Sequence, residues 1–242
     1  SVDVLLDLDI EIIKIGSCSA DDWPLLKKVS ETGRPVIISI AALSMSKIDK
    51  LVSLFEHKKA NFALMHCIAL YPTPYDKLCL NQIELLKNRF PNITIGFSTH
   101  EAPENYKAIQ IAFAKGARIF ERHVGLETGK YKLNAYSSTP EQIAQWITSY
   151  HEAVDTCGGE ERMPPYIEEI HSLNSLKRGV FAKKDIKKGE IIKHDDVFFA
   201  MPVLDGQLIS GEWRENIVAD KDYSANEPLG RCLANYEVSE KD

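Results

Sequence analysis

Five short runs of apolar, mostly β-branched residues alternate with amphipathic segments up to about Gly159. The runs are Ile10–Ile15, Pro35–Ile40, Phe62–Cys67, Ile93–Phe97 and Ile119–Val124, and the segments are Trp23–Glu31, Ser46–His57, Leu80–Phe90, Tyr106–Lys115 and Thr139–Val154. Near-continuous hydrophobic strands that alternate with helices are typical of a parallel sheet covered by helices. Thr139, followed by Pro140, predicts a capped helix start, and Gly116 and Gly158 suit helix ends.

Two α/β folds agree with this pattern. Five strand–helix units in roughly 160 residues are fewer than a closed eight-stranded (β/α)8 TIM barrel of about 250 residues requires. A barrel would therefore lack its first three β/α units in this chain, whereas a doubly wound five-stranded sheet would be complete. The chain starts at Ser1 without an initiator Met or a leader, so we expect its true beginning to lie upstream.

Polar residues at the strand ends favour the barrel. Each of the five apolar runs ends in, or is followed by, at least one polar group. In chain order these groups are Lys14 and Ser17, then Ser39, then His66, then Ser98 and His100, and finally Glu121 and His123. The C-terminal ends of barrel strands build the active site, and core packing does not explain why all five strands carry such groups there.

The pattern changes after residue 159. We expect a barrel-type domain over residues 1–159, a linker over 160–176 that contains Pro164-Pro165, and a second domain over 177–242 built from short strand-like pieces and tight turns.

Composition excludes several classes of protein. A net charge of −6 argues against a nucleic-acid or acidic-membrane binder, and no apolar run approaches the roughly 20 residues of a membrane span. The five cysteines are scattered without a CxxC pair, so we expect reduced thiols and a cytoplasmic enzyme.

Several motifs resemble those of the sialic acid synthase family, in the same order along nearly the whole chain. Residues 66–74 (HCIALYPTP) are similar to the family's "HC…YPTP" segment, residues 96–100 (GFSTH) to "G-S-D-H", and residues 121–124 (ERHV) to "E-[KR]-H-F". Residues 14–17 (KIGS) resemble the family's "K-I-x-S" motif at a strand end. Residues 35–39 (PVIIS) resemble the strand that follows this motif in the family. Residues 183–190 (KKDIKKGE) resemble a turn of the antifreeze-like SAF (β-clip) domain attached to these enzymes.

The resemblance implies a reaction. Family members condense phosphoenolpyruvate with an N-acyl sugar, such as N-acetylmannosamine, to a nonulosonic (sialic-type) acid and phosphate. They need a divalent metal, Mn²⁺ or Mg²⁺, and form a homodimer in which the SAF domain of one subunit covers the other barrel as a swapped lid. Carried over, Lys14, Ser17, Ser39 and Ser98 bind phosphoenolpyruvate, while His100 and His123 are catalytic metal ligands. Tyr71 and Asn134 are the candidate sugar contacts.

The sequence departs from the family mainly on the sugar side. Ser19 and Thr99 replace acidic residues, Ala69 replaces an asparagine, and Asn134 stands where an aspartate is usual. Met201 replaces an arginine of the small domain. With these changes the sequence resembles a divergent branch of the family, the spore-coat polysaccharide biosynthesis proteins. The changes predict an acceptor sugar that differs from N-acetylmannosamine and is more hydrophobic.

Two other functions stay open. Lys14 could be the nucleophile of a Schiff-base aldolase, or the barrel could be degenerate and retained for binding or assembly. The second domain is expected to act as the lid. So small a domain has little core of its own, so we expect its apolar side chains Phe198, Phe199 and Met201 to pack against a surface outside it.

Overall fold

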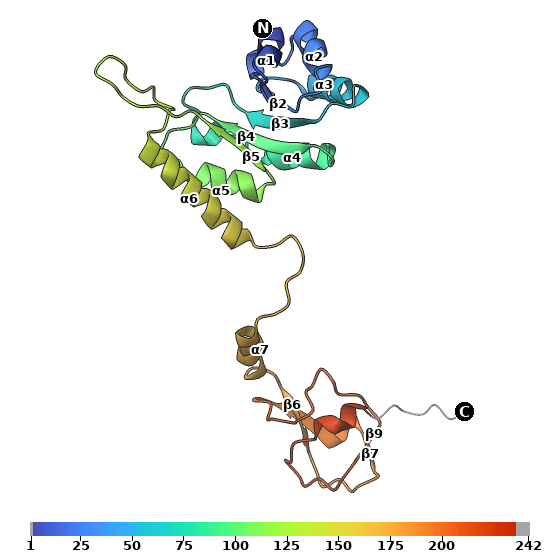
Figure 1. The fold of residues 1–242 in the computed structure, drawn as a ribbon. Coiled ribbons are helices and arrows are strands. Elements are labelled where there is room, and N and C mark those ends of the chain that lie inside the picture. Colours follow the sequence, from blue (N-terminus) through green and yellow to red (C-terminus); the bar gives the residue numbers. More distant parts are fainter. Residues whose placement is uncertain (1, 236–242) are drawn as a thin grey trace. The chain divides into compact units, whose positions relative to one another are not determined.

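The computed structural model describes residues 2–235 (Figure 1). It divides into two compact units on either side of the Gly158–Gly159 bond, and each is described by itself. Residues 236–242 of the expected second domain lie outside the described residues. No helix within the described range has the length and apolar character that a bilayer span requires.

Unit 1 contains one parallel sheet of five strands: β1 (Ile13–Ile15), β2 (Val36–Ser39), β3 (Phe62–Cys67), β4 (Thr94–Thr99) and β5 (Ile119–Arg122). Each strand pairs in parallel with the next one along the chain, so the order is β1-β2-β3-β4-β5. A doubly wound sheet reverses its strand order at a switch point, and this sheet does not. The doubly wound alternative is therefore wrong, and unit 1 is a curled half-barrel.

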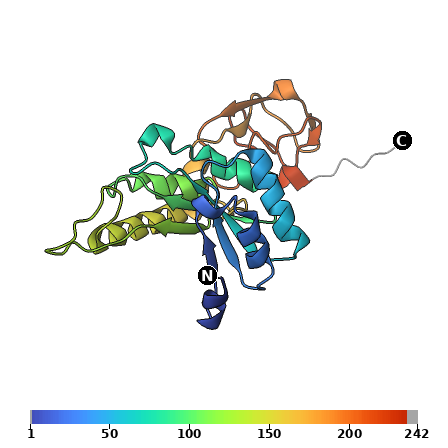
Figure 2. The same ribbon diagram turned by 90° about the horizontal axis from the view of Figure 1, so that it is seen from above.

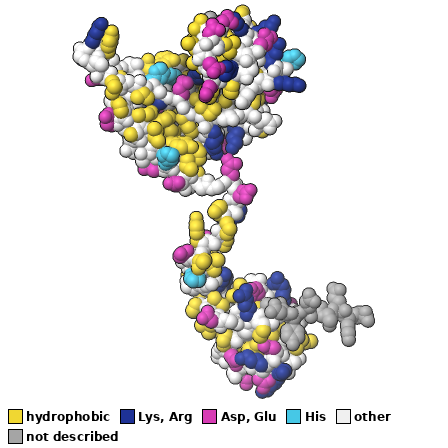
Figure 3. All heavy atoms as spheres, viewed as in Figure 1, with side chains coloured by type: hydrophobic (Ala, Val, Ile, Leu, Met, Phe, Trp, Pro, Cys, Tyr) yellow, Lys and Arg dark blue, Asp and Glu magenta, His cyan; other side chains and the backbone are white. Residues whose placement is uncertain are grey.

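Helices connect the strands. They are α2 (Trp23–Ser30), α3 (Met45–His57), α4 (Asn81–Arg89) and α5 (Lys107–Ala114), with α1 (Val2–Asp7) before the sheet and α6 (Pro140–Cys157) after it. Short 3₁₀ turns cover Ser17–Ser19 and Tyr75–Lys77. Helices α5 and α6 pack side by side (Figures 1 and 2). Figure 3 shows hydrophobic side chains gathered on unit 1. Ile111 of α5 and Ile147 of α6 are among its exposed hydrophobic residues.

Helix α6 begins as predicted. The Thr139 hydroxyl accepts a hydrogen bond from Gln142 N, and the Gln142 side chain accepts one from Thr139 N, which completes a capping box with Pro140 in the first turn. Gly116 and Gly158 end α5 and α6 with positive φ, a backbone conformation that glycine adopts without steric cost.

The strands present two different faces. Side chains such as Ile13, Ile15, Val36, Ile38 and Phe97 belong to one buried hydrophobic core. Because successive side chains of a strand point to opposite faces, the residues between them face the inside of the curl.

Unit 2 holds two small antiparallel sheets. Strand β6 (Gly179–Ala182) pairs with β8 (Val197–Ala200), and β7 (Ile191–Ile192) pairs with β9 (Ile217–Val218). Helix α7 (Ile167–Asn174) comes before them, and 3₁₀ turns cover His194–Asp196 and Arg231–Asn235.

The prediction that this unit has little core of its own is wrong. Val180, Ile186, Ile192, Leu208 and Leu229 are among its fully or almost fully buried residues. Phe199 packs against this cluster, and Phe198 stacks on Phe181 at 5.3 Å between ring centroids, across the paired strands β8 and β6. Of the three side chains expected to need an outside surface, only Met201 is largely exposed, at 62%.

Candidate active site

The inner face of the half-barrel carries the polar groups. Lys14, Ser39, Cys67, Ser98 and Glu121 alternate with core residues on their strands, so all five lie on the inner face. The register brings them together, since Cys67 is opposite Ser98 and Ser98 is opposite Glu121.

These groups line one cavity of about 390 Å³ at the C-terminal ends of the strands. Every predicted site residue except Asn134 lines it. The full lining is Lys14, Gly16, Ser17, Cys18, Ser39, Ala41, Ala42, Cys67, Ala69, Tyr71, Ser98, His100, Glu121 and His123.

Glu121 organises the cationic side of the cavity. Its carboxylate lies 2.6 Å from Lys14 Nζ and accepts a 2.7 Å hydrogen bond from Ser98 Oγ. Burial alone would raise the pKa of the Glu121 carboxyl, but the hydrogen bonds from Lys14 and Ser98 outweigh it and hold the pKa below 4.5. Glu121 stands at the end of its strand in the sequence, but no role was predicted for it. The strand register, which puts Glu121 opposite Ser98, is the signal that points to its role in holding Lys14 and Ser98.

The two remaining serines differ in their bonding. Ser17 Oγ accepts a hydrogen bond of 3.1 Å from Ala41 N, which ties the end of β1 to the end of β2. Ser39 Oγ is buried and has no partner within the described residues. A buried hydroxyl without a partner is costly, so Ser39 is suited to bind a ligand in this cavity.

The two candidate metal ligands lie together. The His100 and His123 rings are 5.2 Å apart between centroids. His100 Nδ1 lies 3.2 Å from Ile68 O, and because a carbonyl only accepts, Nδ1 carries the proton and Nε2 keeps its lone pair. Burial lowers the pKa of His100, which favours the neutral imidazole that metals bind.

A divalent cation fits this donor set. Two imidazoles with water and substrate oxygens suit Mn²⁺, and a hydrogen bond from the second ring nitrogen to a carbonyl commonly orients such ligands. No group of three His, Cys, Asp or Glu side chains arranged to hold a metal occurs between residues 2 and 235, so oxygens from outside the chain would have to complete the coordination.

Two tyrosines surround the histidines. Tyr71 packs edge-on against His100 at 4.5 Å between centroids. Tyr136 contacts Tyr71 at 5.1 Å, His100 at 6.0 Å and His123 at 5.1 Å. Tyr136 was not among the predicted site residues, because it lies in an irregular loop without periodicity.

Asn134 does not join this cavity. It lines a separate hollow of about 490 Å³ between the loops that follow β4 and β5, together with residues such as Glu104, Glu127 and Gln142. Its side-chain oxygen accepts a hydrogen bond from Tyr136 N at 3.2 Å.

A buried ion pair supports the end of β5. Arg122 donates to Glu101 Oε1 at 2.8 Å, and both side chains are 1% exposed. Arg122 Nε also donates to Ser138 Oγ at 2.6 Å. Arg122 lies between Glu121 and His123 in the chain, so these bonds limit how far either neighbour can move.

Known proteins share this chain's sequence and fold. The profile of the NeuB family matches residues 1–162. N-acetylneuraminate-9-phosphate synthase of Drosophila melanogaster is 28% identical, over 93% of this chain and 68% of its own length. An uncharacterized protein of Methanocaldococcus jannaschii is 32% identical over 83% of this chain, which spans 59% of that relative's length.

A solved structure agrees. The crystal structure of a Chromobacterium violaceum protein provisionally named spore coat polysaccharide biosynthesis protein E superimposes with a TM-score of 0.92 and 40% identity, over 96% of this chain and 70% of the other. Since the family profile covers all of the half-barrel and the cavity at its strand ends, this chain belongs to the NeuB family.

Proposed function

We propose that the protein to which this chain belongs condenses phosphoenolpyruvate with an N-acyl hexose to form a nonulosonic acid and phosphate, for a surface polysaccharide. The observation that supports this most is the shared cavity, in which one cation, three serines and two imidazoles converge. The name of the Drosophila relative agrees with this chemistry, and the resemblance to the Chromobacterium protein supports the polysaccharide pathway.

In this proposal the β1, β2 and β4 ends hold the donor. Lys14 binds the phosphoenolpyruvate anion, with hydrogen bonds from Ser17, Ser39 and Ser98. Glu121 already pairs with Lys14 and Ser98, so it holds both groups in place before the substrate arrives.

The histidines serve the acceptor. His100 and His123 would hold Mn²⁺ or Mg²⁺, and the bound metal supplies a Lewis acid for the aldehyde oxygen of the sugar. C3 of phosphoenolpyruvate forms the new bond to the aldehyde carbon, one water is consumed and phosphate leaves. Tyr71 lines the acceptor side of the cavity, and Asn134 contacts the sugar only if the sugar extends to the neighbouring hollow.

We further propose that the enzyme is a cytoplasmic homodimer in which unit 2, as an SAF-type lid, covers the partner's cavity. Bulk water must be kept away from the activated aldehyde while the one water that the reaction consumes is admitted, and the exposed Met201 offers an apolar contact for such a cover. That contact favours a more hydrophobic or deoxygenated sugar than N-acetylmannosamine.

The test is release of phosphate from phosphoenolpyruvate by the full-length protein, with Mn²⁺ and a panel of N-acyl hexoses. We expect release that depends on both the sugar and the metal, and loss of it in His100→Ala. Release without sugar, or none with any sugar, would contradict the proposal and favour a barrel retained for binding.

The Schiff-base alternative makes a different prediction. Schiff-base formation requires a neutral lysine, whereas Lys14 is ion-paired with Glu121. Borohydride trapping with pyruvate should leave Lys14 unmodified, and a covalent adduct on Lys14 would favour the aldolase.

A further inference from the structure

Tyr136 touches both candidate ligand histidines and has no role in the function proposed above. Its ring stands nearly perpendicular to both imidazoles, at 81° to His123 and 78° to His100. Edge-to-face aromatic contacts of this kind prefer a defined geometry. Tyr136 therefore restricts the orientation of both rings at once.

The two histidines are anchored differently. The His100 ring is fixed by its hydrogen bond to Ile68 O. The His123 ring makes no side-chain hydrogen bond to any described residue; it contacts the rings of His100 and Tyr136, and its charge interacts with the Glu121 carboxylate. A metal-ligating histidine almost always has a hydrogen-bonded partner that fixes its ring, and losing such a partner commonly weakens metal binding. Tyr136 occupies that position for His123.

The backbone holds Tyr136 in place. Two residues beyond it, Ser138 N donates to His123 O at 2.9 Å and Gly125 N donates to Ser138 O at 3.0 Å, a parallel bridge that continues strand β5. The Ser138 side chain is fully buried and accepts from Arg122. Tyr136 is thus tethered to the same strand end that carries His123.

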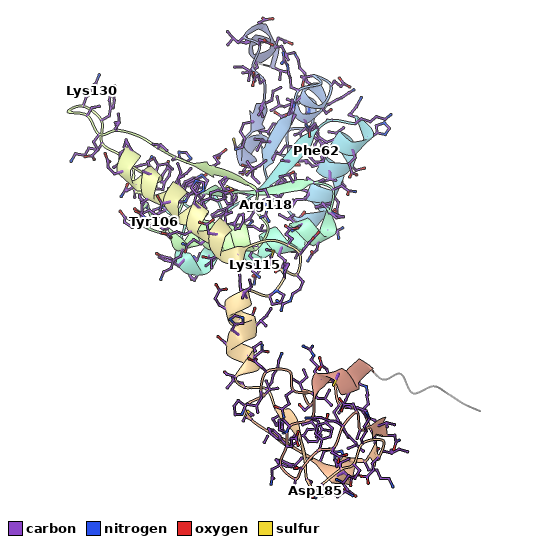
Figure 4. All side chains as sticks on the ribbon, turned by 60° about the horizontal axis from the view of Figure 1, so that its bottom comes forward. Phe62, Tyr106, Lys115, Arg118, Lys130 and Asp185 are labelled. Atoms are coloured by element: carbon purple, nitrogen blue, oxygen red, sulfur yellow. The ribbon has the colours of Figure 1, made fainter. Side chains whose placement is uncertain are left out.

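The rest of this loop projects away from the sheet. Lys130 lies at its tip (Figure 4), and the neighbouring Tyr131 is 64% exposed with its ring beside the Lys130 ammonium. Tyr136, at the base of the loop, is only part-exposed. The loop therefore offers two tyrosines, one against the histidines and one away from them.

We propose that Tyr136 is a positioning residue that orients the His123 imidazole, and through it the divalent cation, by an aromatic contact in place of a hydrogen bond. The effect on cation binding rests on the metal site of the proposed function, whereas the contact between the Tyr136 and His123 rings does not. The phenol oxygen has no part in it, so the ring alone must be sufficient.

The test measures Mn²⁺ binding to the full-length protein by the electron paramagnetic resonance signal of free Mn²⁺. Tyr136→Leu keeps an apolar side chain and removes the ring, and we expect the Kd for Mn²⁺ to rise about 3- to 10-fold. Tyr136→Phe should restore the Kd to that of the unchanged protein. Tyr131→Leu, the matched control, should leave it unchanged.

A second measurement is independent of the metal. In metal-free, histidine-labelled protein, a nuclear Overhauser effect between the Tyr136 and His123 rings is expected, and the His123 resonances should shift in Tyr136→Leu but not in Tyr131→Leu. Absence of both signals overturns the contact, and an unchanged Kd in Tyr136→Leu overturns the positioning role. If the unchanged protein binds no Mn²⁺, the proposed metal site fails while the ring contact is still decided by this second measurement.

Discussion

Lys14 and Glu121 belong to the two outermost strands of the five-stranded sheet, yet their side chains meet, with Lys14 Nζ 2.6 Å from Glu121 Oε2. Neighbouring strands lie about 4.8 Å apart, so a flat sheet would separate β1 from β5 by roughly 19 Å. The two side chains cannot bridge that distance, so the contact requires the curl of the half-barrel. It also places a carboxylate beside the cation proposed to bind phosphoenolpyruvate.

Replacement of Lys14 by Ala should selectively weaken donor binding. A hydrogen bond to a charged group contributes about 1.5–3 kcal/mol, so the KM for phosphoenolpyruvate should rise roughly 10- to 100-fold while the KM for the sugar changes little. Steady-state kinetics on the full-length protein measures both. Lys47→Ala, which breaks an exposed pair with Asp21, is the control and should alter neither. Equal effects of Lys14→Ala on the two substrates would contradict the assignment.

Ser39→Ala should separate binding from stability. Ser39 Oγ has no partner among the described residues, so its removal leaves no group unsatisfied, and urea unfolding should change by less than about 0.5 kcal/mol. The KM for phosphoenolpyruvate should nonetheless rise several-fold. Ser17→Ala is the comparison, because it deprives Ala41 N of its acceptor and should destabilise the fold by about 1–2 kcal/mol. Equal losses of stability in both variants would refute this distinction.

Either His100→Ala or His123→Ala should abolish stoichiometric binding of Mn²⁺ by the full-length protein. Two imidazoles are the only protein ligands proposed, so the loss of one leaves too few donors to hold the ion. Metal content after dialysis measures the effect, and activity lost to a chelator should return with Mn²⁺. His57→Ala, at the exposed end of α3, should bind as the unchanged protein does. Full occupancy in His123→Ala would rule out the two-histidine site.

Arg122→Met should destabilise unit 1 by about 3–5 kcal/mol, because it leaves the Glu101 carboxylate buried without its counter-charge. Thermal or urea unfolding measures the loss. Arg89→Met, which breaks an exposed pair with Asp49, is the control and should have a much smaller effect. Similar losses in the two variants would show that burial of the Arg122 pair does not matter.

His66 should make stability depend on pH. Burial lowers its pKa below the usual 6.5, although the Nε2–H donates to Leu78 O at 2.8 Å. The unfolded chain therefore takes up a proton that the folded one resists. The contribution of the neutral His66 to the free energy of unfolding is fully present above pH 6.5. It is lost as the pH falls from there through the pKa of His66 in the folded state.

Urea unfolding between pH 5 and pH 8 measures this slope. His66→Gln, which keeps a donor for Leu78 O and cannot titrate, should make the slope less steep and leave the part due to His100, whose pKa burial also lowers. His57→Gln on the surface should leave the slope as it is. A slope unchanged by His66→Gln would assign the pH dependence to other groups.

Much of the fold follows from local patterns. The alternation of apolar runs and amphipathic segments predicted all five strands and the helices that follow them, because strand and helix periods are written in neighbouring residues. Thr139 predicted the capped start of α6, which is confirmed. His66, one of the polar strand-end groups, does not line the cavity and hydrogen-bonds to Leu78 O instead. Placing polar groups at strand ends also grouped Lys14, Ser39 and Ser98, since parallel strands end at the same edge.

What the sequence determined by itself was therefore the five strands of unit 1, the helices that follow them and the edge of the sheet at which its polar groups lie. Only the tertiary structure decided between a half-barrel and a doubly wound sheet, because strand order is a property of pairing over long separations. It also paired Glu121 with Lys14, brought Tyr136 against the histidines and put Asn134 in a different hollow. These contacts join segments through the curl of the sheet and an irregular loop, and neither leaves a periodic signal in the chain.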